Sequence, residues 1–124
     1  MNLEQLQEEA RKDLPITNEE DLASESLANQ KIKAKYLDHR SYFARLLQAA
    51  NGDYQRLYRQ KWEYYGGKAD AKVYVSKPFD LKVLKTDLAM YITSDEEVIK
   101  LMNKIGYLEI VIKYIDGVIK SIDN

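Results

Sequence analysis

The C-terminal part of the chain carries an apolar repeat that constrains its fold more than any other feature. Eight aliphatic residues recur at alternating intervals of three and four, which assigns them to the a and d positions of a heptad. They are Val98, Leu101, Ile105, Leu108, Ile112, Ile115, Ile119 and Ile122. The repeat predicts a long helix from about Ser94 to Ser121, and with it an all-α fold.

This C-terminal helix has more apolar surface than a chain of 124 residues needs for its own core. At 1.5 Å per residue its apolar repeat alone, from Val98 to Ile122, is about 37 Å long, and isoleucine at both a and d positions favours bundles of more than two helices. We therefore expect these eight residues to form an oligomeric helical bundle. The alternative is a monomer in which this helix packs only on the helix predicted over residues 18–50.

The N-terminal half of the sequence predicts two further helices. Residues 3–14 have the apolar spacing of a short helix, which should end before Pro15. Thr17 and Glu20 form a capping-box pattern. A second helix is therefore expected to begin at residue 18 and to reach about Ala50.

The middle of the chain alternates between helical patterns and breakers. Asn51-Gly52-Asp53 is typical of a turn or kink, after which a helix is expected from Tyr54 to Tyr65 and should end at Gly66-Gly67. Residues 71–75 alternate like a strand, which Pro78 interrupts. We expect a short extended connector or a small hairpin arm there.

The segment before the C-terminal helix has the signals of a short helix and a cap. Apolar spacing predicts a brief helix within residues 81–91. Thr93 and Ser94 are each followed three residues later by a glutamate, Glu96 or Glu97. This pattern predicts a capping box at the start of the last helix.

Charge is distributed unevenly along a chain whose formal net charge is −1. Residues 1–25 contain eight acidic and two basic residues, whereas residues 26–72 contain ten basic and four acidic ones. A basic middle segment indicates a polyanionic partner. The alternative is that these lysines and arginines coat a solvated helix and that the acidic N-terminal segment pairs with them.

The composition excludes several kinds of site. The chain has no cysteine and a single histidine, His39, so it cannot form a disulfide or a thiolate metal site. Gly66-Gly67-Lys68 lacks the first glycine and the hydroxyl residue of a phosphate-binding loop. The apolar stretch over residues 105–122 is interrupted by charges and cannot span a bilayer. We expect no enzymatic activity, no cofactor, no metal and no membrane partner.

Residues 54–68 interleave aromatic rings with cations. Single-stranded nucleic acid binds to rings that stack on bases and to cations that neutralise phosphates. In a helix, Arg56 and Arg59 share one face, whereas Lys61 lies about 200° from Arg59. Tyr54, Tyr58, Lys61 and Tyr65 form a second stripe, which could equally be a row that faces the core, with the lysine reaching out to solvent.

The segment from Tyr58 to Asp70, YRQKWEYYGGKAD, resembles the basic motif of the UvsY family, the recombination mediators of T-even-type bacteriophages. That motif has the form Leu-Lys-Ala-Arg-x-Asp-Tyr-Tyr followed by a small turn. The opening MNLEQLQEE also matches the family, and residues 35–39 are similar to a family Lys-aromatic-Leu sequence. Tyr58 and Gln60 depart from the motif, and its Lys and Arg appear in reversed order.

The resemblance implies a homo-hexamer or heptamer held by its C-terminal helices, in the cytoplasm of an infected bacterial host. It also implies binding to single-stranded DNA covered by the phage single-strand-binding protein, and loading of a UvsX-like recombinase. The family's two DNA-binding residues correspond to Arg59 and Lys61, and Lys68 replaces a turn arginine. Further candidates for phosphate contacts are Arg56 and Lys72, and the candidate stacking surfaces are Trp62, Tyr58 and Tyr65.

On this interpretation the chain divides at residue 93. Residues 1–92 form a helical region that binds single-stranded DNA, and residues 93–124 form the oligomerisation helix. Two alternatives remain open: a helical-bundle scaffold or assembly chaperone that binds an acidic protein, and a regulator that binds RNA through the same aromatic and basic residues. Dependence of binding on salt, and preference for single strands, would distinguish them.

Overall fold

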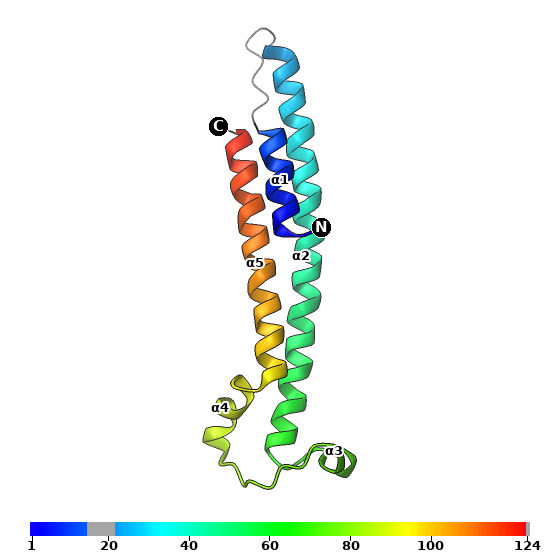
Figure 1. Cartoon of the computed structure of the whole chain (residues 1–124), viewed down its shortest axis with the longest axis vertical. Helices are drawn as coiled ribbons and strands as arrows, with labels where there is room; N and C mark the ends of the chain where they lie inside the picture. Colours follow the sequence, from blue (N-terminus) through cyan, green and yellow to red (C-terminus); the bar gives the residue numbers. More distant parts are fainter. Residues whose placement is uncertain (15–21, 124) are drawn as a thin grey trace. The chain divides into compact units, whose positions relative to one another are not determined.

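A computed structural model describes residues 1–14 and 22–123. Within them the chain is all-α, as predicted, and contains no strand. The elements are α1 (Leu3–Asp13), α2 (Leu22–Tyr65), α3 (Ala71–Ser76), the 3₁₀ turn η1 (Lys85–Asp87), α4 (Leu88–Thr93) and α5 (Glu96–Asp123), and Figure 1 labels the five α-helices. None of these helices has the length and apolarity needed to cross a membrane. The described residues also contain no cluster of three or more potential metal ligands.

The chain forms two compact units. Unit 1 consists of residues 1–47 and 107–124, and unit 2 consists of residues 48–106. Both α2 and α5 contribute residues to each unit.

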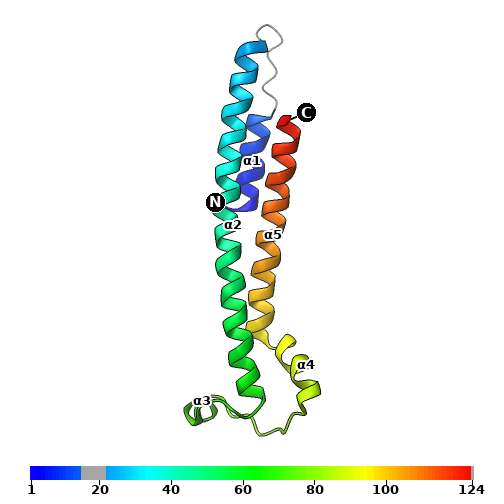
Figure 2. The same ribbon diagram turned by 180° about the vertical axis from the view of Figure 1, so that it is seen from behind.

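Unit 1 consists of α1, the N-terminal part of α2 and the C-terminal part of α5, which lie side by side in both views (Figures 1 and 2). One face of each helix is buried, as the helical spacing predicts. The buried residues are Leu6 and Ala10 of α1, Tyr36 and Phe43 of α2, and Leu108, Val111, Ile115 and Val118 of α5. Leu46 of α2 is 39% exposed.

Polar contacts tie the three helices of unit 1 together. Lys35 of α2 forms ion pairs with Glu9 and Asp13 of α1, with Nζ–O distances of 2.5 and 2.7 Å. The hydroxyl of Tyr36 donates a hydrogen bond to Asp13 Oδ2 at 3.0 Å. Arg40 Nε lies 2.6 Å from Asp116 Oδ1 of α5. Two acids of the N-terminal segment therefore pair with one basic residue of α2, Lys35.

Unit 2 is built on a small apolar cluster. Leu88 and Ile92 of α4 and Val98 of α5 are buried together. Five partly buried residues pack against them: Tyr54, Leu57, Tyr58 and Tyr65 of α2, and Val83. The cluster explains why the short helix α4 forms, because two of its six residues are buried against α2 and α5 side chains.

The heptad residues of α5 differ in how far their own protomer covers them. Val98, Leu108 and Ile115 are buried, whereas Leu101, Ile105, Ile112, Ile119 and Ile122 are half-buried. From Leu108 onwards the buried positions are 108, 111, 115 and 118, so the buried stripe includes Val111 and Val118 in place of Ile112 and Ile119. Only part of the apolar repeat is therefore fully buried inside the protomer.

Two local predictions are wrong, and a third is right only in part. Residues 71–75 lie in the helix α3, because Asp70 caps it by accepting a hydrogen bond from the Lys72 N–H, and irregular chain follows at residues 77–84. The sequence Asn51-Gly52-Asp53 does not interrupt α2. The brief helix expected within residues 81–91 forms as α4, but it begins only at Leu88. Leu81 and Leu84 therefore precede it and are exposed.

The sequence predicted N-terminal caps for two helices, and the structure describes only the one at the start of α5. Asp95, rather than Thr93 or Ser94, caps α5, since its Oδ1 accepts hydrogen bonds from the N–H groups of Glu97 and Val98. The two hydroxyl groups bond instead to carbonyls of α4. The capping box predicted at Thr17 and Glu20 lies outside the described residues.

Candidate nucleic-acid interface

Two arginines lie on the exposed side of the C-terminal part of α2. The side chains of Arg56 and Arg59 are 69% and 82% exposed. Among the described residues each pairs only with an acid of its own helix: Arg56 Nη2 lies 2.6 Å from Asp53 Oδ1, and Arg59 Nε lies 3.3 Å from Glu63 Oε1. Exposed pairs of this kind contribute at most about 1 kcal/mol, so another anion can replace the carboxylate at little cost.

Trp62 and Lys68 extend this exposed surface to the end of α2. Trp62 lies one turn after Arg59 and is 38% exposed. Gly67, with φ of 75°, ends the helix as predicted, and the Lys68 N–H donates a hydrogen bond to the Glu63 carbonyl at 2.8 Å. This turn brings Lys68 Nζ to 5.0 Å from the centre of the Trp62 ring. Residues 56, 59 and 62 follow one another at intervals of three along α2, and Lys68 contacts Trp62. We call these four residues the arginine–tryptophan face.

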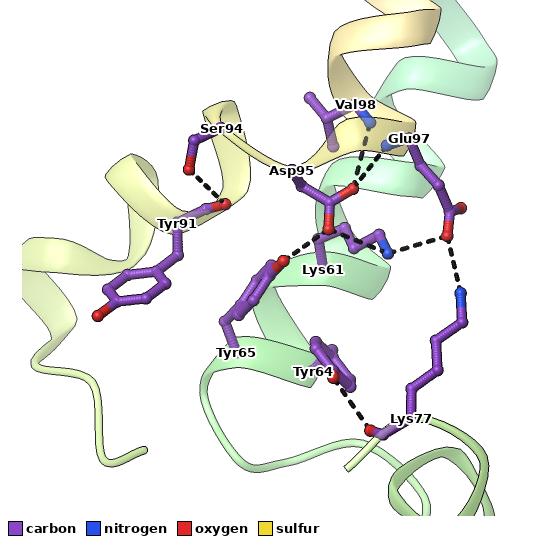
Figure 3. A network of polar contacts seen from close by, with 9 residues as sticks. All are labelled: Lys61, Tyr64, Tyr65, Lys77, Tyr91, Ser94, Asp95, Glu97 and Val98. Carbon is purple, nitrogen blue, oxygen red and sulfur yellow. Dashed lines mark hydrogen bonds and ion pairs between the residues drawn. The ribbon is translucent and has the colours of Figure 1, made fainter. Parts of the chain in front are cut away.

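Lys61 lies on the opposite side of α2 and is held by two carboxylates (Figure 3). Its side chain is 12% exposed, and its Nζ lies 3.2 Å from both Asp95 Oδ2 and Glu97 Oε1. The stripe of Tyr54, Tyr58, Lys61 and Tyr65 therefore faces the core of unit 2, which is the second of the two interpretations that the sequence left open. The two basic residues singled out by the resemblance do not share a surface.

Asp95 is the fixed member of this network. Its Oδ1 caps α5, while its Oδ2 accepts a hydrogen bond of 2.6 Å from the Tyr65 hydroxyl and also contacts Lys61. Burial by itself raises the pKa of Asp95, but the hydrogen bonds from Tyr65 and Lys61 outweigh it, so the pKa lies below its usual value. Burial and the same hydrogen bond raise the pKa of Tyr65.

Glu97 is bound by two lysines. Lys77, which follows α3, reaches its Oε1 at 3.0 Å, and Lys61 reaches the same atom from α2. The hydrogen bonds from Lys77 and then Lys61 lower the pKa of Glu97 and keep it ionised. The sequence pattern indicated Glu97 only as a helix-capping acid and gave no role to Lys77, because nothing in the local sequence connects residues 61, 77 and 97.

An open hollow of about 630 Å³ lies beside this network. Lys61, Tyr64, Lys72, Lys77 and Glu97 are among the residues that line it. Lys72, a predicted phosphate contact, is exposed on α3 and borders the hollow rather than the arginine–tryptophan face. The predicted stacking residues Tyr58 and Tyr65 pack instead against the buried cluster of unit 2.

Comparison with known proteins agrees with this fold. Two solved structures of the bacteriophage T4 recombination mediator protein UvsY are each 22% identical to this chain, with TM-scores of 0.84 and 0.85. Each match covers 99% of this chain, and 86% or 88% of the other. At this identity the likeness shows a shared fold. A search of curated proteins gave no match.

The sequence itself identifies the family. A family model described as "Recombination, repair and ssDNA binding protein UvsY" matches residues 9–124. This match includes the whole of α2 and α5 and every residue of the arginine–tryptophan face. The protein therefore belongs to the UvsY family.

Proposed function

We propose that this protein is a recombination mediator that binds single-stranded DNA and loads a recombinase onto strands covered by single-strand-binding protein. The observation that carries the proposal is the arginine–tryptophan face, in which Arg59 is 82% exposed and Trp62, one turn later, is 38% exposed. Guanidinium groups neutralise phosphates, and an exposed indole stacks on bases of any sequence. Membership of a family of DNA-binding recombination proteins supports it.

Self-association would strengthen this binding. A few exposed cations give weak binding at physiological salt because solvent ions screen them. Repeating the face in an oligomer makes each further contact intramolecular and raises affinity by orders of magnitude. In α5, Ile112 and Ile119 remain half-buried and Ile110 is 57% exposed, so apolar surface is available for contact with other copies. We propose that α5 joins the protomers into a hexamer or heptamer.

The experiment is a salt titration of binding to a labelled oligo-dT. The logarithm of the association constant should fall linearly with the logarithm of salt concentration, with a slope of about −0.7 for each phosphate that the protein neutralises. Arg59→Ala should make the slope shallower by about 0.7 for each phosphate that it leaves without a cation. The control is Arg45→Ala, which removes an exposed arginine from the part of α2 that belongs to unit 1 and should leave the slope unchanged.

Other polyanions test the alternatives directly. Affinity for duplex DNA equal to that for single strands would contradict a mediator, because stacking on Trp62 requires unpaired bases. A clear preference for RNA of the same sequence would favour an RNA-binding regulator. Recombinase loading is measured separately, as the rate at which recombinase filaments form on strands already covered by single-strand-binding protein, with and without this protein.

A further inference from the structure

Two lysines from different segments converge on one oxygen atom. Lys61 Nζ of α2 and Lys77 Nζ lie 3.2 and 3.0 Å from Glu97 Oε1 (Figure 3). Such convergence of two ammonium groups is an arrangement that binds an anionic oxygen, whether it belongs to a carboxylate or to a phosphate. We call Lys61 and Lys77 the lysine pair.

The two carboxylates beside the lysine pair differ in how firmly they are held. Asp95 is 9% exposed and is fixed by the two backbone N–H groups of α5 and by the Tyr65 hydroxyl. The side chain of Glu97 is 53% exposed, and among the described residues only the lysine pair holds it. Glu97 is therefore the carboxylate that another anion can displace.

The space needed by such an anion is present next to Glu97. The hollow of about 630 Å³ opens beside it, and its lining includes Tyr64 and Lys72. It also includes two acids that have partners of their own: Glu63 pairs with Arg59, and Asp70 caps α3. This volume lies within the range of roughly 300 to 1,000 Å³ that is typical of pockets for small ligands. The hollow is therefore large enough to hold a nucleotide unit beside the lysine pair.

We infer that Glu97 is an internal substitute for a DNA phosphate, and that a phosphodiester of a single strand displaces it from the lysine pair on binding. The inference rests on the proposed function and adds to it a second contact region, the hollow beside α3. It makes Lys77 a DNA contact and Glu97 a residue that lowers affinity.

The local charge balance gives the physical reason. The lysine pair is neutralised by Asp95 and Glu97, so this region offers little net attraction while Glu97 is in place. When Glu97 turns away into solvent, Asp95 still balances one lysine and the other is available to a phosphate. The N-terminus of α5 adds partial positive charge that favours an anion at this point.

The test compares two substitutions in the same helical turn. Glu97→Gln removes the competing carboxylate, whereas Glu96→Gln makes the same change of net charge at an adjacent exposed residue, which forms no ion pair with any described residue. Binding of both variants to oligo-dT is measured at one salt concentration. Glu97→Gln should tighten binding about threefold or more, and Glu96→Gln less than about twofold.

A second pair of variants shows whether the lysine pair is responsible. Lys77→Gln should weaken binding to oligo-dT. In the double variant, Glu97→Gln should no longer tighten binding relative to Lys77→Gln alone. Glu97→Asp retains the charge but shortens the side chain, so it should also tighten binding. Circular dichroism confirms that each variant is folded. Equal effects of the substitutions at residues 96 and 97, or a gain that persists without Lys77, would overturn the inference.

The outcome separates this inference from the proposed function. If the parent binds oligo-dT, Arg59→Ala weakens binding and the two glutamate variants behave alike, DNA binding stands and the role of Glu97 is rejected. If the parent shows no binding to single strands at any salt concentration, both proposals fail. A gain specific to Glu97→Gln that requires Lys77 supports both.

Discussion

Asp95 connects the start of α5 to α2, because one of its carboxylate oxygens caps α5 while the other lies 3.2 Å from Lys61 Nζ. The same carboxylate thus satisfies backbone donors and neutralises a cation that is 12% exposed. This double use makes residue 95 more important for the stability of unit 2 than an ordinary helix cap. It also holds Lys61 on the side of α2 away from Arg59.

Asp95→Ala should destabilise the protein by about 2 to 4 kcal/mol. The loss combines a helix N-cap with hydrogen bonds to a charged partner, and it leaves Lys61 without its most buried counter-charge. Urea unfolding followed by circular dichroism measures it. The control is Asp87→Ala, because Asp87 precedes α4 without making a side-chain cap bond. A similar loss in both variants would show that the Asp95 network adds no stability.

Acid should remove the part of the stability that depends on charge at Asp95. The pKa of Asp95 is lower in the folded chain than its usual 3.8. Its contribution to the free energy of unfolding is therefore complete above the pKa of the unfolded chain, and it is lost as pH falls through the pKa of the folded chain. Asp95→Asn keeps a capping side chain but cannot ionise. The difference in urea midpoint between parent and Asp95→Asn should therefore shrink from about pH 5 to about pH 3. A constant difference would contradict the ion pair.

Alkali should weaken unit 1 through Tyr36. Burial, and then its hydrogen bond to Asp13, raise the pKa of Tyr36 above its usual 10.0. As pH rises, the hydroxyl of Tyr36 ionises first in the unfolded chain. Its contribution to stability is therefore complete below the pKa of the unfolded chain and is lost as pH rises towards the pKa of the folded chain. Tyr36→Phe should make stability decline less steeply above about pH 10. The control is Tyr42→Phe, at an exposed tyrosine. The stability of this variant should fall with rising pH as steeply as that of the parent.

Trp62 should report DNA binding directly. It is the single tryptophan of the chain, so stacking of a base on its ring should quench the protein's indole fluorescence. Trp62→Ala should weaken oligo-dT binding about fivefold or more, since base stacking on an aromatic side chain is worth about 1 to 3 kcal/mol. Tyr42→Ala, at an exposed ring in unit 1, should leave affinity unchanged. Unaltered emission at saturation would exclude stacking on Trp62.

Charges on the half-buried isoleucines of α5 should dissociate the oligomer. Ile112→Asp with Ile119→Asp should give a smaller species by light scattering, because burying two carboxylates in an apolar contact is costly. DNA affinity should fall by at least about tenfold as avidity disappears. The control adds the same two charges at exposed positions of α5, Asn103→Asp and Ser121→Asp. Folded monomers that bind as tightly as the parent would contradict the avidity argument.

The helices were predictable because their signals are long and periodic. The heptad residues predict α5, and the spacing before Pro15 predicts α1. The helix breaker Gly52 misled the prediction, because a glycine costs only about 1 kcal/mol in a helix and a helix of 44 residues tolerates it. Residues 71–75 alternate like a strand but form one short helix, since Asp70 supplies a cap that the alternation does not reveal.

The site was only partly predictable from the sequence. The exposure of Arg59 follows from its face of α2, and helical geometry also indicated that Lys61 lies about 200° away. That Lys61 is neutralised depends on Asp95 and Glu97, more than thirty residues later in the chain. No local pattern encodes such a contact. It exists because the cluster of Leu88, Ile92 and Val98 packs against α2 residues and so holds the start of α5 beside them.

The turn at Gly67 has a practical consequence for spectroscopy. The left-handed backbone of this glycine closes the end of α2 and also brings the Lys68 ammonium group over the indole. Unwinding of the last helical turn would therefore move that cation off the ring even without any ligand. Emission from the unliganded protein should thus vary with temperature as this end of the helix frays, and a thermal baseline is needed before changes in emission are assigned to oligonucleotide.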